Sequence, residues 1–510
     1  MKLAPRTFQI YWDAHAWVGV VAALLLHVIF FMGAFALFYR ELNHWAHAGA
    51  TSAEQGRATP LALQPLLERW DRDEPLAGKR RVAFEPEPNG LVADWDARGQ
   101  RHEVRYSPVS GRLEPARSEL GRFLYDMHYL GPLPKGVYVA GVAALGLLFA
   151  LLTGLFLHWK DLTRQWFQFR SERVARTWSS DLHKVLGVFG LPYQLVYAWT
   201  GAVLSLSFAL VQPALVETVF HGDASAARAA RGDNVAPPGP TGKQTGRLPE
   251  LDAALARAQS ELPGLEPDWI SIEYVGDEHS SVNIWGTVPG LPFGTASVVL
   301  SAADNTVIGV TPAAGGPFAR FEAWFFGLHY ARFGGYAVKL LYALLALASC
   351  AVIVSGNLIW LERRDARRAH WGNRLLERVT AGWCAGLVLA TSALFIANRA
   401  LQQLLPVSTV AEQSVFWVVW ALGIAWALRG RARQSSGYQL LVAGASFASA
   451  GLLDLVGGGW RDPTRLGVDA ALLLLWAACV AGGARLVRAP VKQAKGEKTV
   501  HALPALGDAE

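Results

Sequence analysis

One pattern occurs twice in this chain, and it constrains the fold more than any other feature. Residues 13–33 read DAHAWVGVVAALLLHVIFFMG and residues 181–201 read DLHKVLGVFGLPYQLVYAWTG. Both begin Asp-x-His-x-x-x-Gly, and in both the final glycine follows the histidine at the same distance. Each stretch is long enough to span a bilayer, which takes roughly 20 residues. We therefore expect two related membrane helices that bring His15 and His183 to the same depth.

Composition indicates an integral membrane protein. Hydrophobic residues make up 52% of the 510, and there are 20 tryptophans, which is too apolar for an ordinary soluble protein. The net charge of +6 does not point to nucleic acid, because Arg and Lys gather in short loops between apolar runs. The three cysteines all lie inside apolar runs, which excludes a disulfide framework and a CxxC metal site.

Eight apolar runs predict eight membrane helices. Their approximate ranges are 15–38, 136–158, 183–211, 336–360, 380–397, 413–429, 438–456 and 468–487. Basic residues concentrate in three of the connections, which the positive-inside rule places in the cytoplasm. An even number of crossings then puts both termini in the cytoplasm, with the first helix as an uncleaved anchor.

Two long segments lie outside on this topology, and each combines a helical stretch with the period-2 alternation of strands. The expected helices are 63–70 and 251–262, and the expected strands are 81–87, a pair within 91–108, 269–275, 281–288 and a pair within 296–310. We expect hairpin turns at Ala97-Arg98-Gly99 and Ala303-Asp304-Asn305, and a Pro/Gly-rich linker at 232–248. The segments therefore predict two small α+β modules.

These expectations divide the chain into ten regions. They are 1–39 (first membrane helix), 40–135 (first outer module), 136–158 (second helix), 159–182 (cytoplasmic loop), 183–211 (third helix), 212–335 (second outer module), 336–360 (fourth helix), 361–379 (cytoplasmic loop), 380–488 (a C-terminal bundle of four membrane helices) and 489–510 (cytoplasmic tail).

A second repeat links the modules to the helices that follow them. LYDMHYLG (124–131) precedes a run that reaches Thr153-Gly154, and FFGLHYARFGG (325–335) precedes one that reaches Ser355-Gly356. The unit helix–module–helix is therefore present twice. The last four runs carry no histidine and no obvious repeat, so we expect them to form an appended bundle.

The repeat sorts four histidines into two pairs, His15 with His183 at the cytoplasmic face and His128 with His329 at the external face. Neutral imidazole is a ligand for haem iron, and facing histidines in a helical bundle are a common site for it. We predict two bis-histidine haems, one near each face of a core about 30 Å thick. For any one histidine alone, the alternative is a side chain at the wet interface.

Glycines stand at matched positions near these histidines. Either they leave room for a flat macrocycle or they only allow close helix packing. They are Gly19, Gly33, Gly154, Gly187, Gly201 and Gly356.

His27 has no counterpart in the repeat, since the equivalent position is Leu195. It could bond a haem propionate, ligate iron in place of a surface histidine, or bond a neighbouring helix. His44 and His47, like His158 and His370, adjoin polar loops and are expected to be solvated. The chain has no GxGxxG motif after a strand, so we expect the electron donor to be quinol or a separate cytoplasmic reductase.

The stretches DAHAWVG, LYDMHYLG, DLHKVLG and GLHYARFGG, in this order over roughly 10–365, resemble the PepSY-associated transmembrane family. VRYSPVSGRLEP and VVLSAADNTVIGV resemble PepSY domains. The resemblance implies an α-helical integral membrane protein of the bacterial inner membrane, with a duplicated four-helix haem-binding bundle and two PepSY-like periplasmic modules. It also implies that two b haems are ligated by the four paired histidines, His15, His183, His128 and His329.

Some members of that family are ferric-siderophore reductases. The resemblance therefore implies an oxidoreductase that delivers electrons to a ferric siderophore in the periplasm and frees Fe(II). The alternative is a non-enzymatic membrane protein whose modules bind or regulate a periplasmic partner. Trp269, Trp285 and Trp324 could shape a docking face or could serve only for packing.

Overall fold

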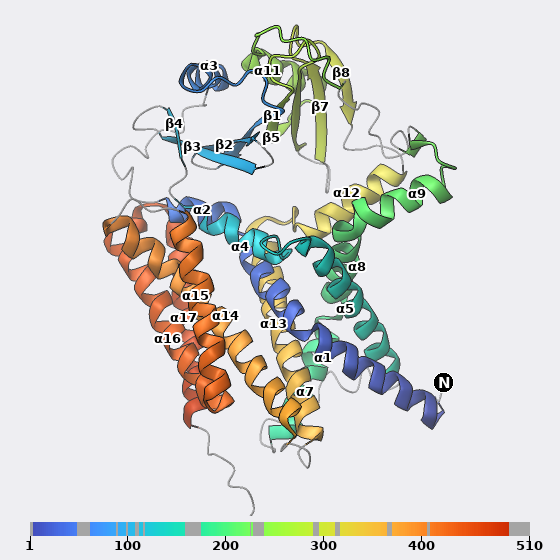
Figure 1. Cartoon of the computed structure of the whole chain (residues 1–510), viewed down its shortest axis with the longest axis vertical. Helices are drawn as coiled ribbons and strands as arrows, with labels where there is room; N and C mark the ends of the chain where they lie inside the picture. The colour runs from blue at the N-terminus through green and yellow to red at the C-terminus, as the bar shows by residue number, and fades with distance from the viewer. Residues whose placement is uncertain are drawn as a thin grey trace, which may run out of the picture.

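The computed structural model describes residues 4–47, 62–87, 90–97, 100–107, 112–115, 118–158, 175–224, 226–227, 239–288, 295–311, 317–364, 370–404 and 409–488. The chain forms two layers, a β-sheet capped by two helices and a larger body of long helices beneath it (Figure 1). We call the end of the helical body that faces the sheet the sheet side, and the opposite end the far side.

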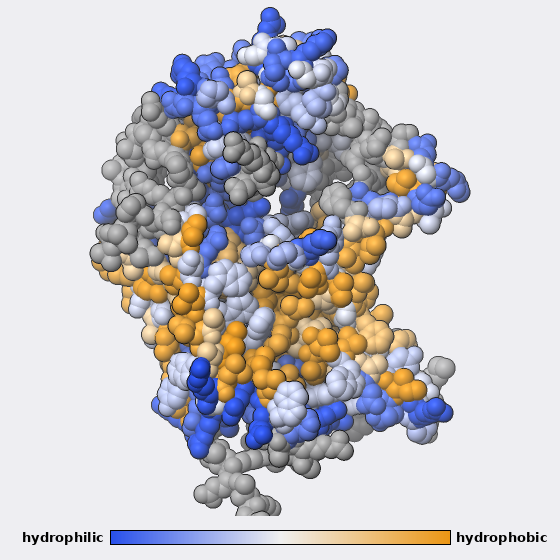
Figure 2. Space-filling view, in the orientation of Figure 1, coloured by the Kyte–Doolittle hydropathy of each residue, from blue (hydrophilic) through white to orange (hydrophobic). Residues whose placement is uncertain are grey.

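The helical body has the character of a multi-pass membrane protein. Among the described residues, seven helices are long and apolar enough to cross a bilayer. They are α1 (Pro5–Ala36), α5 (Gly136–His158), α13 (Gly335–Arg363), α14 (Trp371–Leu404), α15 (Thr409–Arg429), α16 (Ala432–Val456) and α17 (Pro463–Arg488). On the face that Figure 2 shows, hydrophobic side chains form a belt over these helices, with hydrophilic residues at both ends.

The remaining crossing differs from the single helix predicted over 183–211, and that prediction was wrong. The segment forms α7 (Ala175–Phe189), α8 (Leu191–Leu206), a π-helical turn (Ser207–Val211) and α9 (Gln212–Thr218). Pro192 lies in the first turn of α8 and cannot donate a backbone hydrogen bond to α7, which explains the break at Gly190. Beyond Leu206 the chain bends by 70°.

The other boundaries agree with the predicted helices or extend them. α5 coincides with the predicted range 136–158, whereas α1 begins at Pro5 and α13 continues to Arg363. Polar residues at the membrane surface continue the helical hydrogen bonding beyond the apolar run that a hydropathy pattern detects. The predicted loops 159–182 and 361–379 are correspondingly shorter, because α7 begins at Ala175 and α14 at Trp371.

Helices of the two repeats alternate around the first bundle. α1 packs against α5 and α13, while α8 packs against α5 and α7 against α13. Each crossing therefore has one neighbour from its own repeat and one from the other repeat. The first helices of the two repeats, which carry His15 and His183, thus face each other across the bundle.

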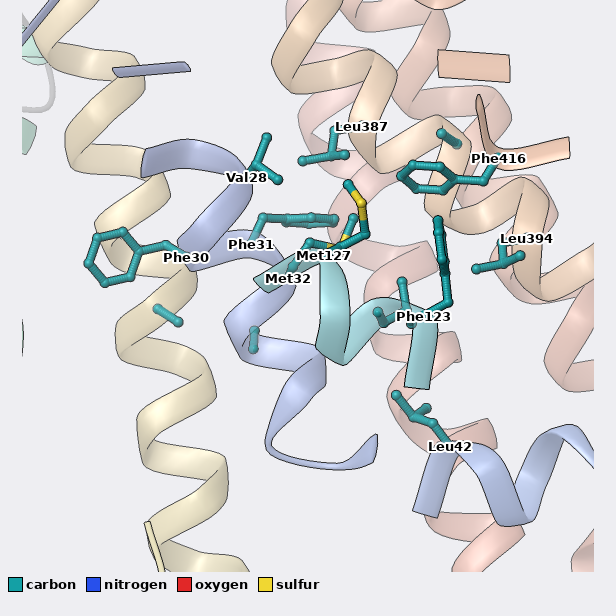
Figure 3. Close-up of a cluster of buried hydrophobic side chains, with 14 of the residues drawn as sticks. Val28, Phe30, Phe31, Met32, Leu42, Phe123, Met127, Leu387, Leu394 and Phe416 are labelled. Carbon is teal, nitrogen blue, oxygen red and sulfur yellow. The ribbon is translucent and has the colours of Figure 1, made fainter. Parts of the chain in front are cut away.

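The C-terminal helices α14 to α17 pack on one another and join the first bundle through an apolar cluster (Figure 3). Phe31 of α1 and Phe123 of α4 (Leu120–His128) point toward Leu387 and Phe416 of the C-terminal bundle. All four side chains are buried, so this contact excludes water across the middle of the body.

Buried charges form a second contact at the sheet side of the C-terminal bundle. Asp454 accepts hydrogen bonds from Arg465 (2.8 Å) and pairs with Arg399 (2.9 Å). Trp45 of α2 (Tyr39–Ala46) donates to Asp469 (2.8 Å). His44 of the same short helix bonds Asp462 (2.6 Å), so the prediction that His44 is solvated was wrong.

His47 is half-buried, its Nε2 atom is buried, and its Nδ1–H donates to the carbonyl oxygen of Asn43 (2.6 Å). The prediction that His47 is solvated is therefore wrong as well, because α2 packs against α4 and α17 and does not lie in a free loop. His370 is exposed, as predicted.

The strands of the two outer segments form one antiparallel sheet in the order β4-β3-β2-β1-β5-β6-β7-β8. The strands are β1 (Arg81–Glu87), β2 (Gly90–Ala97), β3 (Gln100–Ser107), β4 (Arg112–Pro115), β5 (Glu266–Glu273), β6 (Ser281–Thr287), β7 (Thr295–Ser301) and β8 (Val307–Thr311). The two segments meet where β1 pairs with β5, with Phe84 opposite Ile270. The two predicted modules therefore share a sheet.

The predicted strands agree with these elements, and β4 was not predicted. Of the predicted turns, 98–99 lie outside the described residues, while Asn305 has φ 56° between β7 and β8. The predicted linker 232–248 is described from 239 onward. There Asp277 accepts hydrogen bonds from the backbone of Thr241 (3.0 Å) and Gly242 (2.8 Å), so this part is anchored to the sheet layer.

Two helices cover the sheet face that points away from the membrane body, α3 (Leu63–Asp73) and α11 (Leu251–Glu261) (Figure 1). Each caps the other, because Asp252 accepts from the N–H of Leu63 (3.0 Å) and Gln64 accepts from the N–H of Leu251 (2.7 Å). These bonds satisfy N–H groups that a helix start leaves without a partner. The opposite face of the sheet is polar and faces the body of long helices.

Candidate functional site

The far-side pair brings together two histidines from different repeats. The rings of His15 on α1 and His183 on α7 have their centroids 6.2 Å apart, with an angle of 84° between their planes. Each is carried on a helix that begins well before it, so both rings project from rigid backbone.

One ring nitrogen of each histidine is held by the next helix of the bundle. His15 Nδ1 lies 2.9 Å from the carbonyl oxygen of Ala150, and His183 Nδ1 lies 2.8 Å from that of Val352. A carbonyl oxygen can only accept, so Nδ1 carries the proton in both rings. The Nε2 lone pairs are then free to bind a metal, and no described residue hydrogen-bonds them.

The glycines near this pair serve two purposes. A Cβ atom on Gly19 or Gly187, each four residues after a histidine, would meet nothing within 4 Å. A Cβ on Gly154 or Gly356 would lie 3.2 Å from the Cε1 atom of His15 or His183. The first two leave open space beside the rings, and the last two let the rings approach α5 and α13.

That open space belongs to a cavity of about 230 Å³ between the two repeats. Its walls are largely apolar, with Phe30 and Leu147 among them, and Lys184 and Arg364 line it as well. An apolar slot with cations along its lining suits a flat hydrophobic macrocycle that carries carboxylates.

The sheet-side pair is built in the same way from the second set of histidines. His128 ends α4 and His329 ends α12 (Pro317–His329), and their ring centroids are 6.1 Å apart with an interplanar angle of 42°. The carbonyl oxygen of Ile29, farther along α1 than His15, accepts from His128 Nδ1 at 2.8 Å. At the helical rise of roughly 1.5 Å for each residue from His15 to Ile29, the two pairs are about 21 Å apart along α1.

Thr200 determines which ring nitrogen of His329 carries the proton. Thr200 of α8 donates its hydroxyl proton to the carbonyl oxygen of Val196 (2.6 Å), so it must accept from His329 Nδ1–H (2.8 Å). Burial lowers the pKa of His128, and burial together with the neighbouring His128 lowers the pKa of His329 to about 3. Both imidazoles are neutral at pH 7, which is the form that binds iron.

The spacing within both pairs suits two ligands on opposite sides of one metal ion. A metal–imidazole bond is about 2 Å long, so two such rings have their centroids about 6 Å apart once the ring radii are added. Ligand histidines ordinarily donate their other N–H to a carbonyl or a neighbouring acceptor, as all four do here. The chain's own groups therefore fit an iron porphyrin at the far side, where a cavity adjoins both rings, and the sheet-side pair has the matching ring spacing and protonation.

His27 is not brought to either pair by any contact among the described residues. It is 5% exposed, its ring stacks on Phe31 at 6.2 Å, and it is not among the residues that line the far-side cavity. Neither of its ring nitrogens has a hydrogen-bond partner in the described part of the chain. Of the three roles expected for it, a bond to a neighbouring helix is therefore wrong.

Sequence reasoning missed three hydroxyl groups beside the histidines. Thr153 Oγ1 lies 3.3 Å from His15 Nδ1, Ser355 Oγ lies 3.4 Å from His183 Nδ1, and Thr200 bonds His329. Each directly precedes a glycine that the repeat had singled out, so the Thr-Gly and Ser-Gly dipeptides were a usable signal. Gly33 is the matching glycine at the end of the first repeated stretch, but it follows Met32, which has no hydroxyl group.

The three tryptophans considered for a docking face lie in the sheet and on α12, the helix that ends at His329. Trp269 and Trp285 are paired across β5 and β6, on the polar face of the sheet. Trp324 of α12 is 53% exposed and lines a cavity of about 370 Å³ between α8 and α12, which Thr200 also lines. Trp285 is 38% exposed, so it is available for more than packing.

The sequence is similar to those of known proteins. The model of the PepSY-associated TM region matches residues 12–363, which include all four paired histidines and end with α13. The uncharacterized protein PA4219 of Pseudomonas aeruginosa (strain PAO1) is 31% identical over 308 residues, covering 56% of this chain and 74% of that protein.

Proposed function

Since this chain belongs to the PepSY-associated transmembrane family, we propose that it is an oxidoreductase with two b haems that reduces ferric iron outside the bacterial inner membrane. The ferric iron is siderophore-bound, and its reduction frees Fe(II). On this proposal the sheet side is periplasmic and both termini are cytoplasmic.

One observation supports the proposal above the others. Two pairs of neutral imidazoles stand about 21 Å apart along α1, and each pair has the spacing of two ligands around one metal. In each ring the proton sits on Nδ1, which leaves Nε2 for iron. A purely structural use of histidine would not require the same tautomer four times.

The residues have distinct tasks in this function. Haem iron, when bound, alternates between Fe(II) and Fe(III) and so carries one electron at a time. His15 and His183 would hold it at the far side, and His128 and His329 at the sheet side. Buried apolar side chains such as Phe30 keep water from the space between the pairs.

The donor would be quinol or a separate cytoplasmic reductase. A ferric chelate held by hard oxygen ligands accepts one electron, and the resulting Fe(II) is held more weakly because it is the softer ion. The acceptor must therefore reach the sheet-side pair, and the donor must reach the far side or the membrane interior.

The test is the absorption spectrum and haem content of the purified full chain. We expect a red protein with two haems per chain, a split α-band of b type after dithionite, and reoxidation by a ferric siderophore. His329→Ala should lose one of the two haems and abolish ferric reduction. His370→Ala, an exposed histidine just before α14, should keep both and serves as the control.

Two results would count against the proposal. A colourless protein would favour the alternative, a membrane protein that binds or regulates a periplasmic partner without redox chemistry. A His329→Ala variant that keeps both haems would show that the sheet-side ligand assignment is wrong.

A further inference from the structure

The two copies of the sheet-side turn share one backbone conformation. After His128, Leu130 has φ 60° and Gly131 donates its N–H to the carbonyl oxygen of Asp126 (2.8 Å). After His329, Ala331 has φ 50° and the next residue donates its N–H to the carbonyl oxygen of Gly327 (3.1 Å). This is the bonding that ends a helix with a left-handed residue.

The copies differ at the residue that follows the left-handed one. The first copy has Gly131, with no side chain, and the second has Arg332. The turn holds the backbone of Arg332, which follows His329 of the sheet-side pair by three residues. The two turns therefore have the same backbone conformation, but only the one after α12 carries a positive charge.

Arg332 is held by aromatic rings and not by an acid. Its Cζ atom lies 5.6 Å from the ring centroid of Trp285 on β6 and 5.2 Å from that of Tyr330. The residue is exposed, and no acidic side chain among the described residues pairs with it. Contacts with aromatic faces leave the guanidinium N–H groups at its edge available.

Two other arginines near the sheet, Arg40 and Arg122, are already paired with acids. Arg40 pairs with Glu85 (3.1 Å) and Asp268 (3.4 Å), which tethers the helical body to the sheet. Arg122 pairs with Asp126 at 3.0 Å. Structural ion pairs thus account for these two arginines, whereas Arg332 has a fixed position and no counter-ion in the described part of the chain.

We propose that Arg332 binds the anionic oxygen ligands of the ferric substrate and so selects chelates that carry net negative charge. The inference rests on the proposed function and deepens it, because it names the substrate class. The chelate would dock between the sheet and the helical body, the two layers that Trp285 and Arg332 bring into contact.

The chemistry of the two groups is complementary. Fe(III) is bound by hard oxygens such as carboxylate and catecholate, and the planar guanidinium donates two parallel hydrogen bonds to such groups. Trp285 and Tyr330 supply flat surfaces on which an aromatic chelator can stack. Arg332 makes and breaks no covalent bond; the one electron that converts Fe(III) to Fe(II) comes from the proposed activity.

The experiment uses probes that cannot be reduced. Ga(III) has the charge of Fe(III) and a similar size, and it stays Ga(III), so its binding reports docking independently of haem. We would titrate the purified full chain by calorimetry with trianionic Ga(III) tris-catecholate and with neutral Ga(III) tris-hydroxamate.

We expect Arg332→Gln to weaken binding of the trianion by about tenfold or more, the loss of one charge-assisted contact. Binding of the neutral complex should not change. Arg332→Lys keeps the charge but loses the planar fork, so it should restore part of the affinity. Arg461→Gln is the matched control, because Arg461 is also an exposed arginine over a tryptophan, Trp460, at 4.9 Å.

Three outcomes would overturn the inference: the parent chain fails to bind the trianion, Arg332→Gln binds it as tightly as the parent, or the variant loses both probes equally. These results are separable from failure of the proposed function. A colourless chain with Arg332-dependent Ga(III) binding would refute the reductase and keep the docking site, and a working reductase with no effect of Arg332 would do the reverse.

Discussion

The glycines beside the histidines are of two kinds, and the difference is measurable. Gly19 and Gly187 face open space, whereas Gly33 faces the ring of His128. A Cβ atom on Gly33 would lie 2.9 Å from His128 Nδ1, closer than such atoms approach. Since that nitrogen bonds Ile29 at 2.8 Å, the ring cannot move aside without losing its orientation.

Gly33→Ala should therefore remove the sheet-side haem while the far-side one stays. The expected result is one haem per chain in place of two, measured as haem against protein in the purified variant. Gly146→Ala is the control, because a Cβ there meets Val18 at an ordinary 3.6 Å. Full haem content in Gly33→Ala would contradict the role given to His128.

Between elements, single hydrogen bonds from one helix orient the ring of a paired histidine on another helix. Thr200 belongs to α8 and His329 to α12, and their 2.8 Å contact sets the tautomer of the ring. On α1 and α4 the same task falls to a backbone carbonyl, that of Ile29. The two repeats thus reach one arrangement through different atoms.

Thr200→Val keeps the shape of the side chain and removes this acceptor. We expect affinity for the sheet-side haem to fall about 10–100-fold, as for other partners of metal-bound histidines. One of two midpoint potentials should shift in a spectroelectrochemical titration. Thr218→Val removes a similar bond within α9, to Ala214 at 2.6 Å, and should change neither potential. Identical titrations for parent and Thr200→Val would refute this role.

At the scale of the whole molecule, a buried ion network holds the C-terminal bundle together and reaches α2. Asp454 is 2% exposed and balances Arg399 and Arg465, which are each 5% exposed. Arg399 also donates to the carbonyl oxygen of Trp45, so the network links the C-terminal bundle to the short helix α2 that follows α1. Removing one partner leaves buried charge without compensation.

Asp454→Asn should destabilise the protein by about 3–5 kcal/mol, the usual effect of breaking a buried ion pair. Reaction of the buried thiols of Cys350 and Cys479 with a maleimide dye during heating would report the loss as a lower melting temperature. Glu261→Gln breaks the exposed pair with Arg257 (2.7 Å) and should cost only about 0.3–0.5 kcal/mol. An unchanged melting temperature for Asp454→Asn would show that the network contributes little to stability.

The sequence was most informative where a local pattern was repeated. The predicted helix 136–158 and strand 81–87 coincide with α5 and β1. The spacing of the duplicated units predicted that His15 would face His183 and that His128 would face His329, and the rings lie 6.2 and 6.1 Å apart. Duplication makes such distant contacts predictable because it implies pseudo-symmetry.

Contacts between segments that share no repeated pattern could not be predicted from the sequence. β1 and β5 pair although two membrane crossings lie between them in the chain, and strand alternation says which residues face a core but not which strand lies alongside. His44 looked solvated because its partner, Asp462, comes from a bundle with no repeat to relate it. The break at Gly190 lay inside an apolar run that hydropathy treats as continuous.

By itself, then, the sequence determined most of the membrane helices, most of the strands and which histidines belong together, because periodicity and duplication are local or symmetric properties. The tertiary structure alone decided which ring nitrogen carries the proton, that the two outer segments share one sheet, and that Arg332 stands on Trp285 with no acid beside it among the described residues. Those features depend on atoms from distant segments meeting within hydrogen-bond or van der Waals distance, and nothing in a single stretch of chain encodes that meeting.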